Sequence, residues 1–510
     1  MANLSKVFSA ELDGIDARLI EVETDINTGL HSFTIVGLAD KALSEAKERV
    51  NSALKNAGVK APNRENRKIV VNLAPADLKK NGSRHDLAIA VGYLLATKQI
   101  KAFETKDKIF VGELALSGAL RPVNGALSIA RLAKKKGFQY VILPKENAAE
   151  AAMIPDIEVV PVDNLEELIA HLEERKNIPV HPETKIQFSS PAGFPDLSEV
   201  KGQEHAKRAL MIAAAGGHNL IMVGPPGTGK TMLAQALNSI LPEPTLEEAI
   251  EVTQIHSAAG SLGEHSYIGF RPFRAPHHTA SPVAVVGGGQ NPKPGEISLA
   301  HRGVLFLDEL PEFRRDLLES LRQPLETGKV TVSRVRQSLD FPSKFILVAA
   351  MNPCPCGYSG DLEKECRCAA FEVLRYQKKV SGPLLDRIDL QINVPRLKIE
   401  ELRTAKTSGS EGIRQRVAEA RVVQAKRLVG QKALTNSEMS SKLTEKFVNL
   451  DQSAEDLIKK VFDKSLISTR GYYRILKVAR TIADLDHSDQ VSENHLAEAF
   501  NYRVKSAEVS

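Results

Sequence analysis

Eight consecutive residues, 224–231, have the spacing of a phosphate-binding loop. They match G-x-x-x-x-G-K-[ST] and stand between a short apolar run and a helical pattern. In that context backbone amides wrap phosphate groups at a helix N-terminus. We expect Lys230 to neutralise the β- and γ-phosphates of ATP, and the Thr231 hydroxyl to ligate Mg²⁺. The predicted nucleotide-binding residues are Gly224, Pro225, Pro226, Gly227, Thr228, Gly229, Lys230 and Thr231.

Two adjacent carboxylates end the apolar run at 303–309, about 75 residues further on. Ligands of parallel sheets bind beyond the C-terminal ends of the strands. Asp308 is therefore expected to hold Mg²⁺ through water, and Glu309 to polarise the attacking water as a general base. Asn352 ends the next apolar run and is placed to orient water or contact the γ-phosphate. A solvated acidic loop and a simple turn asparagine are the alternatives.

All the cysteines of the chain lie in one short stretch after Asn352, with the pattern C-x-C-x9-C-x-C. Such a loop can fold back so that four thiolates meet tetrahedrally at ~2.3 Å from zinc. Zinc held this way would be structural, because no position is left for water. A redox-labile pair of disulfides and unliganded thiols are the alternatives. The predicted ligands are Cys354, Cys356, Cys366 and Cys368.

Composition limits the class of protein. A chain of 510 residues suggests about three domains at roughly 150 residues each. It has no leader pattern and no apolar run of ~18 residues, so we expect a cytoplasmic protein without membrane contact. Sixty-eight basic and 63 acidic residues give a net charge of +5, which is compatible with a polyanionic partner without establishing one.

The sequence divides into stretches of different pattern and predicts an α/β multidomain protein. Residues 1–182 mix short apolar runs with helical patterns, as in an α+β domain, and 183–197 are a proline-containing linker. Residues 198–395 alternate short, fully apolar strand candidates with helices, which predicts a parallel sheet covered on both faces. Residues 396–510 carry charged helical patterns and predict an all-α lid.

The order of phosphate loop, Asp-Glu pair and "AAMNP" strand resembles that of AAA+ ATPases. The resemblance implies further roles, because 381–390 is similar to the arginine-finger segment of the branch with magnesium chelatases and MCM helicases. Arg387 would then donate to the nucleotide of a neighbouring subunit. Arg470, in a segment similar to the second sensor of that branch, would contact nucleotide in its own subunit. A finger acting in trans implies a ring, expected to be a homo-hexamer. Surface ion pairs are the alternative for both arginines.

Residues 271–313, together with 352–358, resemble the magnesium-chelatase-like YifB/ComM family, and the resemblance spans the whole chain. It implies a Lon-protease-like N-terminal domain (1–182). In the Lon register Leu127 takes the position of the catalytic lysine and Arg84 that of the nucleophile, with Ser83 one residue away. Without a lysine to accept its proton Ser83 is an ordinary hydroxyl, so no peptidase activity is expected.

The same resemblance implies an ATP-driven DNA motor, because ComM-type proteins are described as helicases that promote branch migration when transforming DNA is integrated. The partner would be single-stranded or branched DNA. Residues 328–344 predict a basic hairpin, and in related helicases a hairpin at this position projects into the pore. A solvated edge hairpin is the alternative. The expected phosphate contacts are Lys329, Arg334, Arg336 and Lys344.

Two other functions remain open. One is the ATPase component of a magnesium-chelatase-like metal-insertion complex, which is disfavoured because chelatase ATPase subunits lack the Lon-like domain. The other is a nucleotide-gated chaperone or adaptor whose Lon-like domain binds protein clients. His277 and His278 receive no chemical role.

Overall fold

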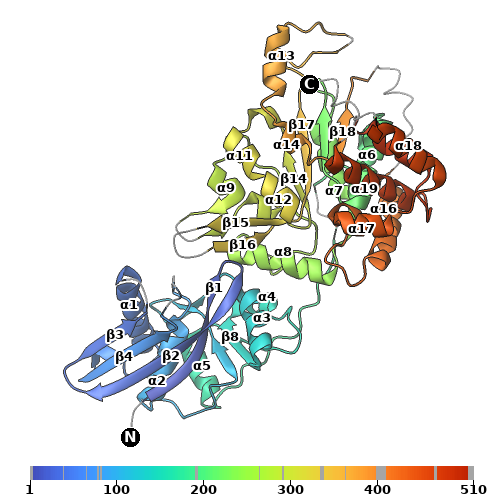
Figure 1. Cartoon of the computed structure of the whole chain (residues 1–510). Helices are drawn as coiled ribbons and strands as arrows, with labels where there is room; N and C mark the ends of the chain where they lie inside the picture. Colours follow the sequence, from blue (N-terminus) through green and yellow to red (C-terminus); the bar gives the residue numbers. More distant parts are fainter. Residues whose placement is uncertain are drawn as a thin grey trace. The chain divides into compact units, whose positions relative to one another are not determined.

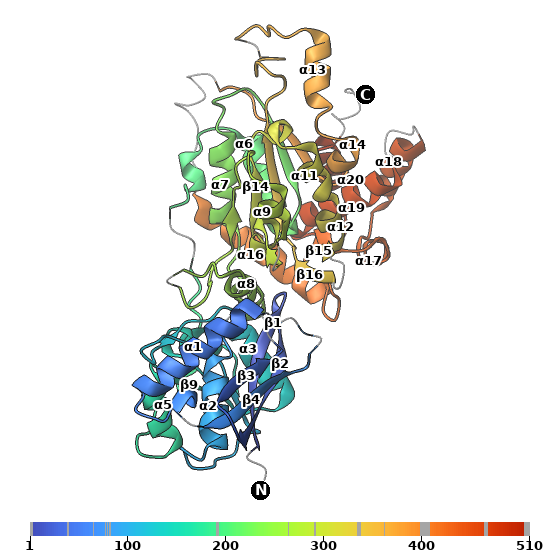
Figure 2. The same cartoon turned by 90° about the vertical axis from the view of Figure 1, so that its left-hand side faces the viewer.

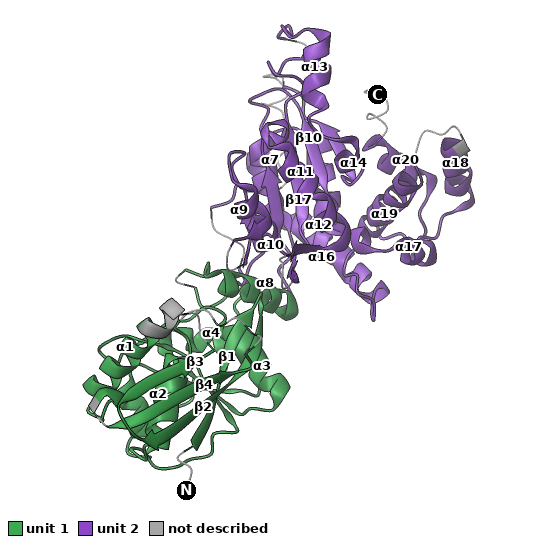
Figure 3. Cartoon of the chain, turned by 60° about the vertical axis from the view of Figure 1, so that its left-hand side comes forward, with its two compact units in different colours: residues 1–187, 246–268 green, residues 188–245, 269–510 purple. Residues whose placement is uncertain are grey.

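The computed structural model divides into two compact units, residues 1–187 with 246–268 and residues 188–245 with 269–510 (Figure 3). The residues that the structure describes are 4–37, 40–64, 66–76, 78, 80, 83–189, 193–263, 265–289, 292–333, 338–361, 363–397, 409–463 and 468–503.

The first unit is built on a seven-stranded mixed sheet (Figure 1). In their order across the sheet the strands are β3 (Ser32–Val36), β4 (Arg67–Ala74), β2 (Asp16–Thr28), β1 (Leu4–Asp13), β5 (Lys108–Phe110), β8 (Tyr140–Pro144) and β9 (Glu158–Val162). Strand β2 pairs antiparallel with β1 and β4, whereas β3 and the edge formed by β5, β8 and β9 run parallel to their neighbours. The α+β character predicted for this part of the chain is confirmed.

Helices cover both faces of this sheet. They are α1 (Asp40–Asn56), α2 (Asp86–Ala96), α3 (Ala126–Lys136), α4 (Ala148–Ala151) and α5 (Leu165–Leu172), and a small hairpin pairs β6 (Glu113–Leu114) with β7 (Leu120–Arg121). Side chains alternate between the faces of β1, so Val7 packs into the core that contains α2 and Phe8 into the core that contains α3. Both faces of this strand are therefore buried under helices.

Helix α8 (Leu246–Ala259) belongs to the first unit, although the sequence pattern placed it in the ATPase domain. It packs against α3, where the backbone N–H of Gly125 donates to Ser257 Oγ (2.8 Å). Gln254 Nε2 donates to the carbonyl of Ile15 (2.9 Å). The buried side chains of α8 thus find their partners among residues far away in sequence, which a local pattern does not reveal.

The second unit contains a five-stranded parallel sheet, as its short apolar runs predicted. Across the sheet the strands are β11 (Phe273–Arg274), β14 (Val304–Leu307), β17 (Ile346–Met351), β10 (Leu220–Val223) and β18 (Leu390–Asn393). Helices α6 (Glu204–Gly216) and α7 (Lys230–Ile240) pack on this sheet (Figure 2). Because all five strands run in one direction, their C-terminal ends lie along a single edge.

The C-terminal helices share one hydrophobic core with α6 and the sheet rather than a separate one. They are α16 (Ser410–Arg427), α17 (Ser441–Phe447), α18 (Gln452–Asp463), α19 (Thr469–Leu485) and α20 (Glu493–Asn501). The all-α character predicted for this stretch is confirmed, and the structure groups it with the five-stranded parallel sheet in one unit. Among the described residues, no helix combines the length and the apolar character needed to cross a bilayer.

The second unit also contains shorter elements. They are α9 (Pro282–Val286), β12 (Gly287–Gly288), β13 (Lys293–Pro294), α10 (Glu296–Leu299), α11 (Arg315–Ser320), α12 (Arg322–Thr327), β15 (Lys329–Ser333), β16 (Ser338–Pro342), α13 (Ala370–Gln377) and α14 (Gly382–Leu385). In Figure 1, α13 extends beyond the end of β17.

Candidate nucleotide-binding site

The predicted phosphate loop runs from the end of β10 to the first residue of α7. Gly229 has a left-handed backbone (φ 85°) directly before Lys230, the first helical residue. Gly224 donates its N–H to the carbonyl of Met351 (3.2 Å) in the neighbouring strand. A side chain at Gly224 would lie 2.2 Å from the carbonyl oxygen of Val394, so only glycine lets the loop pass the end of β18.

Lys230 lies inside this loop with its ammonium group buried. Its Nζ donates to the carbonyls of Gly224 (2.7 Å) and Pro225 (2.8 Å), and contacts Asn352 Oδ1 (3.3 Å). Burial lowers the pKa of Lys230, and the negative charges of Asp308 and Glu309 offset part of that effect. A buried cation with these neutral partners is ready to receive a phosphate group.

The two predicted acids directly follow β14, beside the loop. Thr231 Oγ1 donates to Asp308 Oδ2 (2.9 Å), so the two predicted Mg²⁺ ligands are in contact. The other oxygen of Asp308 accepts the backbone N–H of Glu309 (2.9 Å). Glu309 itself has a left-handed backbone (φ 50°, ψ 48°), which is uncommon for a residue with a side chain and concentrates at functional sites.

A pocket of about 520 Å³ adjoins these residues and is lined by Glu309 and Asn352 on one side. Its other side comes from the segment after the cysteines, including Arg375 and Lys379, whose Nζ pairs with Glu312 (3.3 Å). The sequence predicts no role in the site for Arg375, which lies in α13, or for Lys379, two residues after its end. Their i, i+4 spacing close behind the cysteine loop is the only sequence signal.

The sequence predicts no chemical role for His278, but the structure brings it close to Glu309. Its Nδ1 lies 3.8 Å from the Glu309 carboxylate, and its ring is 4.1 Å from that of His277. The structure therefore places this histidine beside the predicted general base.

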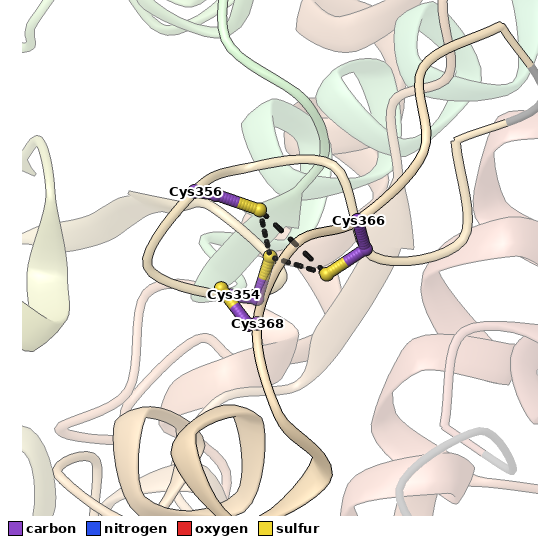
Figure 4. Close-up of side chains that lie close together, drawn as sticks. All are labelled: Cys354, Cys356, Cys366 and Cys368. Carbon is purple, nitrogen blue, oxygen red and sulfur yellow. Dashed lines mark hydrogen bonds between the residues drawn. The ribbon is translucent and has the colours of Figure 1, made fainter.

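The four cysteines meet in space, as their spacing predicted (Figure 4). The sulfur of Cys354 lies 3.4 Å from that of Cys356 and 3.7 Å from that of Cys366, and all four sulfurs lie within 4.8 Å of one another. Four sulfurs placed tetrahedrally at ~2.3 Å from zinc would be ~3.8 Å apart. The donor set and its spacing therefore fit zinc, whereas a disulfide requires a sulfur–sulfur distance of about 2.05 Å.

Ionisation in this cluster is uneven. Hydrogen bonds from the backbone N–H groups of Tyr358 and Arg367 lower the pKa of Cys356 to about 6. A backbone hydrogen bond from Cys356 lowers the pKa of Cys368, but burial and the neighbouring Cys356 and Cys354 thiols outweigh it and raise that pKa to about 12. Four thiolates at this spacing require a cation to balance their charge.

The cysteine loop is braced against the phosphate loop. Gly357 has a left-handed backbone (φ 87°), and a side chain there would lie 2.6 Å from the ring of Pro226. Asp361 pairs with Arg396 (2.9 Å), and Gln377 Nε2 donates to the carbonyl of Pro353 (3.0 Å). The loop is thus tied at both ends.

Arg387 and Arg470 come together at Glu326 in the last turn of α12. Arg387 Nη2 lies 2.7 Å and Arg470 Nη2 2.8 Å from the same oxygen, Oε1. Arg387 is 7% exposed. Among the described residues, no hydrogen bond or ion pair joins either arginine to residues 224–231, and the roles expected of both toward nucleotide stay predictions.

The predicted basic hairpin is confirmed as β15 paired antiparallel with β16. Lys329 is exposed and lies 3.4 Å from Asp340 on the other strand. Arg334 and Arg336 lie outside the described residues. Lys344 differs from its prediction, because its ammonium group pairs with Glu438 (2.5 Å) and contacts the carbonyl of Lys432 (3.2 Å). It links the base of the hairpin to the C-terminal helices.

The Lon-register residues of the first unit take ordinary structural positions. Leu127 is fully buried in the apolar core around α3, where a lysine ammonium would lose its hydration. Ser83 donates to the Glu113 carboxylate, and Arg84 Nε lies 3.4 Å from Glu11. Ser83 and Arg84 therefore make structural polar contacts with neighbouring carboxylates.

Comparisons with known proteins match the whole chain. Three family models match, "Magnesium chelatase, subunit ChlI" over residues 196–402, "Subunit ChlI of Mg-chelatase" over 22–147 and "Magnesium chelatase, subunit ChlI C-terminal" over 407–503. The chain is 45% identical to competence protein ComM of Haemophilus influenzae, with 98% of each chain covered. It is 44% identical to the uncharacterized protein YifB of Escherichia coli, covering 98% of this chain and 97% of that one.

A weaker similarity concerns part of the chain. It is 27% identical over 192 residues to the Lon protease of Rhizobium meliloti, covering 36% of this chain and 23% of that one. Part of the chain is therefore similar to Lon protease.

Gly357→Ala tests the contact between the cysteine loop and the phosphate loop. Gly360 offers a matched control, since it shares the left-handed backbone (φ 77°) but has nothing within 4 Å of an added side chain. Gly360→Ala should cost about 1–2 kcal/mol of stability through backbone strain, and Gly357→Ala about 1–3 kcal/mol more through the clash with Pro226. Thermal unfolding and binding of a fluorescent ATP analogue measure both effects. Only Gly357→Ala should weaken nucleotide binding, and equal behaviour of the two variants would contradict the contact.

Proposed function

The chain belongs to the magnesium-chelatase-like AAA+ family of ComM and YifB, and from this premise we propose that it is an ATP-hydrolysing ring motor acting on DNA in the cytoplasm. The observation that carries the ATPase proposal is the convergence of Lys230, Thr231, Asp308, Glu309 and Asn352 at the ends of three neighbouring parallel strands.

Each of these residues has a proposed role. The loop amides and Lys230 bind the phosphates of ATP, and Thr231 and Asp308 hold Mg²⁺, which neutralises phosphate charge when it is bound. Glu309 accepts the proton of the attacking water, and Asn352 orients that water. The contact between Thr231 and Asp308 supports the pairing of the metal ligands, and the pocket shared by Glu309 and Asn352 supports their common task.

Glu309→Gln removes the proposed base while keeping the side-chain size. The variant should bind ATP normally and hydrolyse it at least ~10²-fold more slowly, the usual scale for a lost general base. Asp316→Asn is a control, because Asp316 is an exposed acid paired with Arg314 (2.7 Å) outside the pocket. Steady-state phosphate release and binding of labelled ATP separate the two steps. Near-normal turnover of Glu309→Gln would exclude the assigned role.

DNA is the proposed substrate of the motor. The hairpin of β15 and β16 presents exposed Lys329 at the start of β15, and the sequence has two further arginines, Arg334 and Arg336, between the two strands. Basic groups on a hairpin contact phosphates without reading bases. The similarity to a protein named competence protein ComM supports this choice. We further propose a homo-hexameric ring, in which Arg387 of one subunit reaches the nucleotide of the next and Arg470 contacts the nucleotide of its own subunit.

ATP hydrolysis measured with single-stranded, duplex and forked DNA tests this substrate. Stimulation by single-stranded or branched DNA is expected. Lys329→Ala combined with Arg336→Ala should lower DNA affinity and reduce the salt slope of binding by about 0.7–0.9 per lost phosphate contact. Lys459→Ala is the control, since Lys459 is 66% exposed and pairs with Glu455 at 3.5 Å, much as Lys329 is 59% exposed and pairs with Asp340 at 3.4 Å.

A metal-insertion ATPase is the second candidate, because all three matching family models are named for the chelatase subunit ChlI. The absence of any stimulation by DNA, with intact basal hydrolysis, would favour this candidate or a nucleotide-gated chaperone over the motor.

We also propose that the cysteine cluster binds one structural zinc ion. Its use would be to hold the loop between Asn352 and α13 against Pro226, since four thiolates leave no open coordination position.

Metal analysis of freshly purified protein should give about one equivalent of zinc per chain. Replacing Cys366 and Cys368 by serine should remove it and lower the thermal stability of the ATPase unit, because the loop loses its closure. The exposed Ser333→Ala is a neutral control. Less than about half an equivalent in the wild type would contradict zinc and favour free thiols.

A further inference from the structure

Glu326 bonds both of the arginines that the family resemblance singles out. Its Oε1 accepts from Arg387 Nη2 (2.7 Å) and Arg470 Nη2 (2.8 Å). We propose that Glu326 is a positioning residue that holds Arg387 beside Arg470 until the nucleotide of the neighbouring subunit replaces it as the partner of Arg387. This proposal rests on the proposed ATPase ring.

Charge explains why the carboxylate is needed. Two guanidinium groups within hydrogen-bond distance of one oxygen repel each other, and the negative charge between them offsets that repulsion. Arg387 depends on this carboxylate more than Arg470 does, because its side chain is 8% exposed and that of Arg470 is 53% exposed, so water screens its charge less. Among the described residues, Glu326 is the one carboxylate within 4.0 Å of Arg387.

The hydrogen bonds of Arg387 leave room for another acceptor. Its Nη1 donates to the carbonyl of Pro383 (2.5 Å), while its Nε is buried with no hydrogen-bond partner. A buried unpaired donor on a charged group is costly. A guanidinium fork binds carboxylate and phosphate with the same geometry, so a phosphate bearing several oxygens satisfies donors that one carboxylate oxygen does not.

Glu326 also stands close to the proposed DNA hairpin. Only Thr327 and Gly328, whose backbone is left-handed (φ 66°), separate it from β15. Side chains of α12 bond that strand, with Gln323 Nε2 donating to Thr331 Oγ1 (3.2 Å) and Thr327 Oγ1 to the carbonyl of Lys329 (3.2 Å). A shift of β15 on binding DNA would therefore move α12 and weaken the hold of Glu326 on both arginines.

Glu326→Gln keeps the size of the side chain and removes its charge. The full-length variant should hydrolyse ATP without DNA about three- to ten-fold faster than the wild type, the scale expected when partly exposed charged pairs are lost. Its rate with saturating DNA should match the wild type, so the stimulation ratio falls by the same factor. The gain should lie in kcat, with KM for ATP unchanged. A purely structural role would lower both rates instead.

Glu455→Gln is the matched control, because Glu455 is 48% exposed and pairs with Lys459 in the same unit without touching either arginine. The gain of Glu326→Gln must disappear when Arg387→Ala is added, since the effect is transmitted through that arginine. An unchanged or lower basal rate in Glu326→Gln, or a gain that survives Arg387→Ala, would overturn the proposal. The basal rate is measured without DNA. If DNA does not stimulate the wild type, the DNA motor is refuted, but the comparison of basal rates still tests the role of Glu326.

Discussion

One buried ammonium group constrains the second unit. Lys230 lies inside a tight loop, where burial opposes its charge and its hydrogen-bond partners are two carbonyls and the Asn352 amide oxygen. The positive charge of this ammonium group is balanced only when an anion binds beside it. The parallel sheet supplies the rest. Strand β17 lies between β14 and β10, so the C-terminal ends of β14 and β17 bring two carboxylates and an amide to the place where that anion binds.

Much of this site was predictable from the sequence. Lys230 and Asn352 are 122 residues apart, and Thr231 and Asp308 are 77 apart, yet each stands directly at the end of a short apolar run or at the helix that follows one. Parallel strands share an edge, so the position of a residue relative to its own strand determines which other residues it meets. The cysteines were predictable for a different reason, since their spacing in one loop leaves few ways for them to be far apart.

The remaining features depend on contacts that no local pattern contains. Lys344 belongs to a basic stretch, but its charge is paired with Glu438, 94 residues away. Arg470 was assigned by resemblance, and the structure shows it sharing Glu326 with Arg387, a pairing set by where the first turn of α19 meets the last turn of α12. Arg375 and Lys379 line the pocket because the segment after the cysteine loop lies beside Glu309 and Asn352. In each of these cases tertiary packing determines the partner of the basic residue. Similar residues elsewhere in the chain form simple surface ion pairs.

Helix α8 has a consequence for the order in which the protein is made. The first unit is not a continuous stretch of chain, because α8 joins it only after residues 188–245 have been synthesised. A ribosome therefore releases β10, the phosphate loop and α7 before the N-terminal unit can bury Ser257 and Gln254 against its own helices. Domains commonly fold one after another as they emerge. Here the N-terminal unit can finish folding only after part of the second unit has been synthesised, so the folding of the two units overlaps in time.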